Sequence, residues 1–135
     1  CFFMEINLIL ENIKMTSGSF YEKLYEEGIF DDRLFAELIL FVDKFNGKTL
    51  SKTERLRKSS ELWELAYLIQ SSLGANYNEN DGFQITNKEE EKLIEIGNIL
   101  GYICKSFSEN QDLNITRSMI LLLPMGRLFI FMILK

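Results

Sequence analysis

Paired carboxylates are the residues of this chain whose types and spacing could do acid–base chemistry. They stand at Glu26–Glu27, Asp31–Asp32 and Glu89–Glu91, and a glycosidase uses such a pair of carboxyl groups. The chain contains no histidine, so the commonest general base and activator of nucleophiles is missing. Each acidic group falls at the expected start or end of a helix, where capping and solvation account for it. We expect a protein that is not an enzyme, with a glycosidase-type carboxylate pair as the alternative.

The two cysteines offer neither a disulfide framework nor a common zinc site, because no histidine completes a four-ligand set. Cys104 lies on the apolar side of an expected helix, where a thiol behaves as a small buried hydrophobe. Cys1 is either a lipidated N-terminus or the end of a longer apolar segment lost by truncation, and Phe2 and Phe3 favour truncation. We therefore expect no metal and no cofactor.

Phosphate, calcium and nucleic-acid binding find little support in the sequence. Residues 75–86 form the longest expected loop, which lacks the glycine spacing of a phosphate loop and the final glutamate of a calcium loop. The net charge of −5 argues against a nucleic-acid partner. The densest basic spot, at Arg55, Arg57 and Lys58, is interpreted as a solvated helix face.

Aromatic residues supply the remaining candidate site, a surface for binding another protein. Tyr21, Tyr25 and Phe30 lie around one expected short helix, and Trp63 and Tyr67 lie one turn apart on a longer one. Aromatic residues at helical spacing are more often core. Any of these five that is exposed is a protein-contact candidate, because aromatic anchors dominate the energetics of interfaces.

The elements that must position these residues are helices. A short polar residue followed three positions later by glutamate marks a helix start at Ser19, Ser51 and Asn87. Apolar residues at helical spacing follow these starts, which predicts an all-α, single-domain bundle of five or six helices over residues 1–118. Helices are expected over residues 2–15, 20–27, 32–45, 52–73 and 88–107, with stops at Gly28 and Gly74 and an N-cap at Asp31 or Asp32.

The apolar rows of these helices predict the core. Its expected members are Leu38, Phe41, Leu65, Ile69, Leu93, Ile96 and Leu100. The helix over residues 32–45 is apolar around most of its circumference, which is typical of a central helix. Gly97 and Gly101 lie four residues apart in the last helix, where each costs up to about 1 kcal/mol relative to alanine. The expected compensation is the close approach of a second helix.

Residues 119–135 form an apolar tail interrupted by Pro124, Gly126 and Arg127. The tail is too short to cross a bilayer, which takes about 20 residues. It is expected to pack on the bundle or to associate with a membrane or a partner.

Several short sequence segments resemble the stage III sporulation protein AB family of endospore-forming bacteria. Leu93–Gly101 is similar to the late-helix pattern of that family, with Gln111 resembling its downstream glutamine. Leu8–Leu24 is similar to its opening helix and turn, and Ser60–Trp63 to its mid-chain segment. The resemblance implies a helical bundle similar to the cytoplasmic domains of type II secretion platform proteins, with no catalytic residues. It implies a platform component of a channel complex that contacts a motor ATPase.

The leading hypothesis is therefore a non-enzymatic component of a bacterial sporulation or secretion-like membrane complex. Its expected partners are a motor ATPase or channel proteins. It is expected in the cytoplasm or on the cytoplasmic face of the membrane, and it could associate with the membrane through its termini. Self-association into a homo-oligomer also stays open. The alternative is a small cytosolic helical immunity or inhibitor protein that neutralises a toxin or enzyme, which the size and acidic charge suit equally well.

Overall fold

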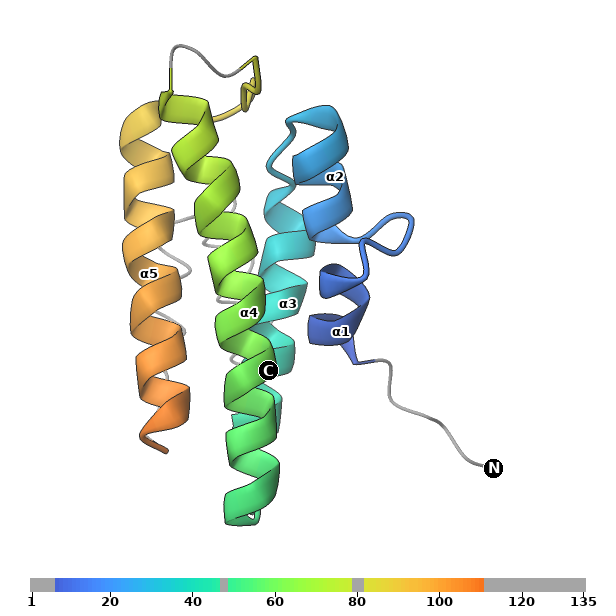
Figure 1. Cartoon of the computed structure of the whole chain (residues 1–135), viewed down its shortest axis with the longest axis vertical. Helices are drawn as coiled ribbons and strands as arrows, with labels where there is room; N and C mark the ends of the chain where they lie inside the picture. The colour runs from blue at the N-terminus through green and yellow to red at the C-terminus, as the bar shows by residue number, and fades with distance from the viewer. Residues whose placement is uncertain (1–6, 47–48, 79–81, 111–135) are drawn as a thin grey trace.

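Helices form the framework of the residues that the computed structural model describes, which are 7–46, 49–78 and 82–110 (Figure 1). The helices of this part are α1 (Leu8–Ile13), α2 (Phe20–Glu27), α3 (Asp32–Asn46), α4 (Lys52–Tyr77) and α5 (Glu90–Ser108). α4 and α5 run side by side in opposite directions, and α1 and α2 pack on α4 away from α5 (Figure 1). The prediction of an all-α bundle is confirmed.

The helix-start signals act as predicted at Ser19 and Ser51. The Ser19 hydroxyl accepts from the N–H of Glu22 at 3.3 Å, and the Ser51 hydroxyl accepts from the N–H of Glu54 at 3.1 Å. Asp31 begins α3 in the same way, since its Oδ1 accepts from the N–H of Leu34 at 3.0 Å. Each bond satisfies one of the N–H groups that a helix start leaves without an intrahelical partner.

The prediction of a helix start at Asn87 was wrong. Asn87 does not cap α5, which begins after Glu89 with no side-chain capping bond; the Asn87 side chain instead binds the backbone of Phe30. The expected stop at Gly74 was also wrong, because α4 continues through it to Tyr77. At the other end of the chain, α1 stops at Ile13, and Met15 takes the left-handed backbone with φ 55°.

The core lies where the apolar rows predict it. Leu38, Leu65, Ile69, Leu93, Ile96 and Leu100 are buried, while Phe41 is only partly buried and packs against the core. Three phenylalanine rings that lie on or beside α2 and α3 meet at centroid distances of 5.0–5.1 Å, namely Phe20, Phe30 and Phe35. Aromatic contacts of this kind add to the free energy gained from burial.

The central place predicted for residues 32–45 belongs to α4 instead. α4 packs against α1, α2 and α5, whereas α3 packs mainly against α1 and α2 (Figure 1). Several apolar side chains of α3 are accordingly only partly buried, among them Leu34, Leu40 and Phe45.

Two further predictions concern residues outside the described part of the chain. They are the apolar tail over 119–135 and the N-terminal segment that includes Cys1. Among the residues that the structure describes, no helix combines the length and the apolar character needed to cross a membrane.

Candidate protein-contact surface

Large apolar side chains are exposed along one stripe of α4. Leu56, Trp63 and Tyr67 are 72%, 48% and 70% exposed. Their separations of seven and four residues place them on one helix face. Between Leu56 and Gly74 the other residues of this stripe, Ser60 and Gln70, are uncharged, while the exposed Lys52 stands at its start and the exposed Glu64 lies beside it. Because an exposed helix face is normally charged or polar, this stripe is unusual for a surface facing only water.

α5 continues the apolar surface beside α4. Ile94 and Tyr102 are also exposed, and an alanine methyl placed at Gly101 would meet no atom within 4 Å. Within the described residues, six of the seven exposed large hydrophobic side chains lie on α4 and α5, the seventh being Tyr25 on α2. We call the surface formed by Leu56, Trp63, Tyr67, Ile94 and Tyr102 the α4–α5 face.

The α4–α5 face is held in shape by hydrogen bonds across the seam between the two helices. The Trp63 Nε1–H donates to the Ser108 hydroxyl at 3.0 Å, and Gln70 Nε2 donates to the Gly97 carbonyl at 2.7 Å. The Trp63 ring is therefore oriented before any partner arrives, which reduces the side-chain entropy that binding would cost. The seam opens into a shallow groove of about 280 Å³ between Gly74 and Gly97.

Arg55 links α4 to α5 near the start of α4. The interpretation of Arg55, Arg57 and Lys58 as a solvated helix face was therefore wrong for Arg55. Its Nη1 donates to the Phe107 carbonyl at 3.0 Å and to Asn46 Oδ1 at 2.8 Å, and its guanidinium lies 5.0 Å from the centre of the Phe107 ring. Lys58 likewise pairs with Glu61 at 3.2 Å.

The two glycines predicted to permit close helix packing differ from each other. At Gly97 the neighbour is the Gln70 side chain of α4, whose Oε1 would lie 2.9 Å from an added Cβ. At Gly101 no atom lies within 4 Å of an added Cβ, so the close-packing prediction was wrong there. Gly101 instead lies beside the exposed side chains of α5.

The five aromatic contact candidates separate into three exposed and two buried residues. Trp63, Tyr67 and Tyr25 are exposed, whereas Tyr21 and Phe30 are only 5% and 1% exposed. Tyr21 and Phe30 belong to the core, so their assignment to a contact surface was wrong. Burial follows from the packing of α2 against α1, α3 and α4, which places both side chains in the shared core.

Exposed charges lie at opposite ends of the α4–α5 face. Lys52 and Arg57 are exposed in the first two turns of α4, and Glu90 and Glu91 are exposed in the first turn of α5. Since α4 and α5 are antiparallel, Lys52 and Arg57 lie at one end of the unit, together with the exposed Glu109, and Glu90 and Glu91 lie at the other end, together with the exposed Lys92 (Figure 1). The surface is thus apolar along its length with ends of opposite charge.

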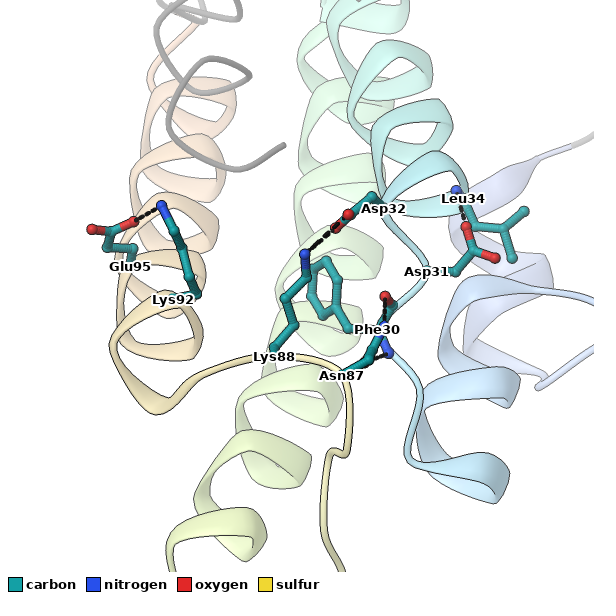
Figure 2. A network of polar contacts seen from close by, with 8 residues as sticks. All are labelled: Phe30, Asp31, Asp32, Leu34, Asn87, Lys88, Lys92 and Glu95. Carbon is teal, nitrogen blue, oxygen red and sulfur yellow. Dashed lines mark hydrogen bonds and ion pairs between the residues drawn. The ribbon is translucent and has the colours of Figure 1, made fainter. Parts of the chain in front are cut away.

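A pair of loops fixes the α4–α5 unit against the rest of the bundle (Figure 2). The Asn87 side chain binds the backbone of Phe30 twice: Nδ2 donates to the carbonyl, and Oδ1 accepts from the N–H, both at 2.8 Å. The N–H of Thr86 donates to the Gly28 carbonyl at 2.9 Å. We call these contacts between residues 28–32 and 84–88 the loop clamp.

Charged residues complete the loop clamp. The Lys88 ammonium lies 2.8 Å from Oδ1 of Asp32 across the clamp (Figure 2). On the α2 side, outside the clamp itself, the Lys23 ammonium lies 2.9 Å from Oδ2 of Asp31. Burial acts to raise the pKa of Asp31, but the bonds from Lys23 and from the Leu34 N–H outweigh it and hold that pKa below its ordinary value. The carboxylates at 31 and 32 therefore have structural partners.

The remaining candidates for chemistry are the cysteine thiol and groups of metal-binding side chains. Cys104 is buried, and burial raises the pKa of its thiol to about 12. In the described ranges, no three side chains among the cysteines and carboxylates are grouped to hold a metal ion.

Sequence reasoning missed Leu56, Ile94 and Tyr102 as exposed members of the candidate contact surface. Leu56 carries a usable signal, because it stands seven residues before Trp63 on the same stripe. Ile94 and Tyr102 flank the buried row of α5 and cannot be distinguished from core residues by spacing alone. No protein-family model, curated protein or solved structure matches this chain significantly.

Proposed function

We propose that this protein acts by binding other proteins through the α4–α5 face and catalyses no reaction. The observation that carries the proposal is the concentration of exposed large hydrophobic side chains on that face, including its tryptophan and a tyrosine that is 70% exposed. Tryptophan and tyrosine at the centre of an interface often contribute about 2 kcal/mol or more each when they become buried.

The rigidity of the face supports a binding role. Trp63 is bonded to Ser108 and Gln70 to the backbone of Gly97, so two positions of the seam are already ordered. The loop clamp orders the end of the unit through the two bonds between Asn87 and Phe30. A surface that is ordered in advance loses less conformational entropy on association.

In its specific form, the proposal is a platform component of a bacterial sporulation or secretion-like membrane complex, on which a motor ATPase or channel proteins assemble. This form rests on the sequence resemblance together with an exposed apolar face on a helical bundle. The α4–α5 face would be one of the surfaces through which the platform is built.

The test compares the complete chain with Tyr67→Arg and with Glu37→Arg as a matched control. Both substitutions place arginine at an exposed helix position, but position 37 lies on α3 away from the α4–α5 face. Each version is co-expressed with a motor ATPase, which the platform hypothesis predicts to be encoded beside the gene, and the retained ATPase is measured. We expect retention by the unmodified chain and by Glu37→Arg, and at least a tenfold loss, about 1.4 kcal/mol or more, for Tyr67→Arg.

Equal retention by all three versions would refute the assignment of the face. If the gene instead has a neighbouring toxin gene, and the chain binds that toxin and abolishes its activity, the immunity-protein hypothesis would replace the platform hypothesis. Tyr67→Arg would then be expected to release the toxin, since the contact surface is the same.

A further inference from the structure

We propose that a second copy of this chain covers the α4–α5 face, with the two α4 helices antiparallel about a twofold axis. This proposal rests on the proposed contact function of the face and names its occupant. Self-association would build the platform on which other components assemble.

The charges select the orientation of the second copy. Two copies that meet through one shared face are related by a twofold axis in the plane of that face. An axis along the helices would bring Lys52 and Arg57 against the same residues of the second copy. An axis across the helices instead brings them to the end that carries Glu90 and Glu91, where the opposite charges attract.

The side chains along α4 fit this antiparallel arrangement. When the two α4 helices cross at the level of Leu65, Trp63 of one copy lies opposite Tyr67 of the other. In the same register Leu56, which is 72% exposed, lies opposite Gly74. An added Cβ at Gly74 would meet no atom within 4 Å, so open space faces the leucine.

The middle of the stripe itself is uncharged, and the exposed carboxylate of Glu64 lies at its flank, one residue after Trp63. Ser60 and Gln70 are uncharged and lie opposite each other in this register. The interface therefore has an aromatic and aliphatic centre with charges toward its rim, as protein interfaces commonly do.

The experiment measures the dissociation constant of the purified complete chain by sedimentation equilibrium. Trp63 is the single tryptophan, so its emission gives an independent reading in the same samples. The unmodified chain should be dimeric when concentrated, and its emission should shift to longer wavelength as dilution releases the monomer. Tyr67→Arg should raise the dissociation constant by at least about tenfold.

Charge exchange tests the antiparallel orientation. Lys52→Glu combined with Arg57→Glu, in one variant, and Glu90→Lys combined with Glu91→Lys, in another, should each weaken the homodimer by about tenfold or more. Mixing the two variants should restore association, since each then presents the charge that the other requires. Lys14→Glu on the helix cap after α1 is the matched control and should leave association unchanged, and circular dichroism checks that every variant is folded.

A monomeric unmodified chain at high concentration would overturn the second copy as occupant. If that monomer still retains the motor ATPase through Tyr67, the proposed function stands without it. A dimer insensitive to Tyr67→Arg would place self-association on another surface, and failure of the mixed variants to associate would overturn the antiparallel orientation. A dimer of the expected kind that retains no further component would refute the platform function alone.

Discussion

Replacing Gly28 with alanine is the sharpest perturbation of the loop clamp, and Gly18 provides its matched control. Both glycines have left-handed backbone, with φ 66° at Gly28 and 84° at Gly18. The left-handed conformation costs alanine about 1–2 kcal/mol of stability at either position. An added Cβ meets no atom within 4 Å at Gly18, but at Gly28 it collides with the backbone carbonyl of Gln84.

The collision should push residues 84–87 away from α2. Three hydrogen bonds would then be lost or stretched, one between Thr86 and Gly28 at 2.9 Å and two between Asn87 and Phe30 at 2.8 Å. At roughly 1 kcal/mol for each bond, Gly28→Ala should cost about 4–5 kcal/mol against about 1–2 kcal/mol for Gly18→Ala. Urea unfolding followed by circular dichroism measures both values.

A difference of about 3 kcal/mol between the two variants would support the loop clamp as the device that joins α4–α5 to α2–α3. Equal losses would refute that reasoning, because the backbone penalty alone would then explain both. A smaller loss at Gly28 than at Gly18 would contradict the predicted collision as well.

Three further predictions concern single sites. Gly97→Leu should lower the free energy of unfolding by about 1–3 kcal/mol because it displaces the α4 side chain bound there, whereas Gly101→Leu has open space and should change thermal stability little; a larger loss at Gly101 would contradict this. Because its pKa is lowered in the folded chain, Asp31 should stabilise the protein at neutral pH and lose that contribution as acidification protonates it. Asp31→Asn should therefore reduce the difference in the free energy of unfolding between pH 7 and low pH. An unchanged difference would refute a stabilising role for the pair of Asp31 with Lys23. With Cys1→Ser in place, Cys104 should resist a thiol reagent near neutral pH until the chain unfolds, and rapid labelling of the folded chain would be contrary to its pKa of about 12.

The features that sequence could predict are those fixed by local chemistry. Ser19 and Ser51 cap helices because a hydroxyl at that position reaches the next free N–H groups without help from distant residues. The left-handed stop at Gly28 is local for the same reason. The buried rows of α4 and α5 follow from helical spacing, so Leu65, Ile69 and Leu93 could be placed in the core.

The features that sequence missed depend on contacts between distant parts of the chain. Asn87 has the spacing of a helix N-cap, but its side chain instead makes two hydrogen bonds to the backbone of Phe30, 57 residues away. α4 passes through Gly74 because Leu73 and Ile69 are buried against the bundle, which outweighs the cost of about 1 kcal/mol for a helical glycine.

The candidate surface was predictable only in part. Trp63 and Tyr67 were recognised by residue type, but spacing alone could not show that they are exposed while Tyr21 and Phe30 are buried. Both pairs lie at intervals that suit a helix face or a core row. Which of them faces water is decided by where α1 and α2 pack against α4, and that is a property of the whole bundle.

Oxidative footprinting of two tyrosines tests the central claim most directly. Tyr67 and Tyr25 are both exposed in the isolated chain, at 70% and 53%. Hydroxyl-radical oxidation of each is compared between the dilute purified protein and the protein in intact cells at its native level. If the α4–α5 face is the contact surface, Tyr67 should be oxidised severalfold more slowly in cells while Tyr25 is unchanged. Equal oxidation of Tyr67 in both settings, or protection of Tyr25 alone, would contradict the account.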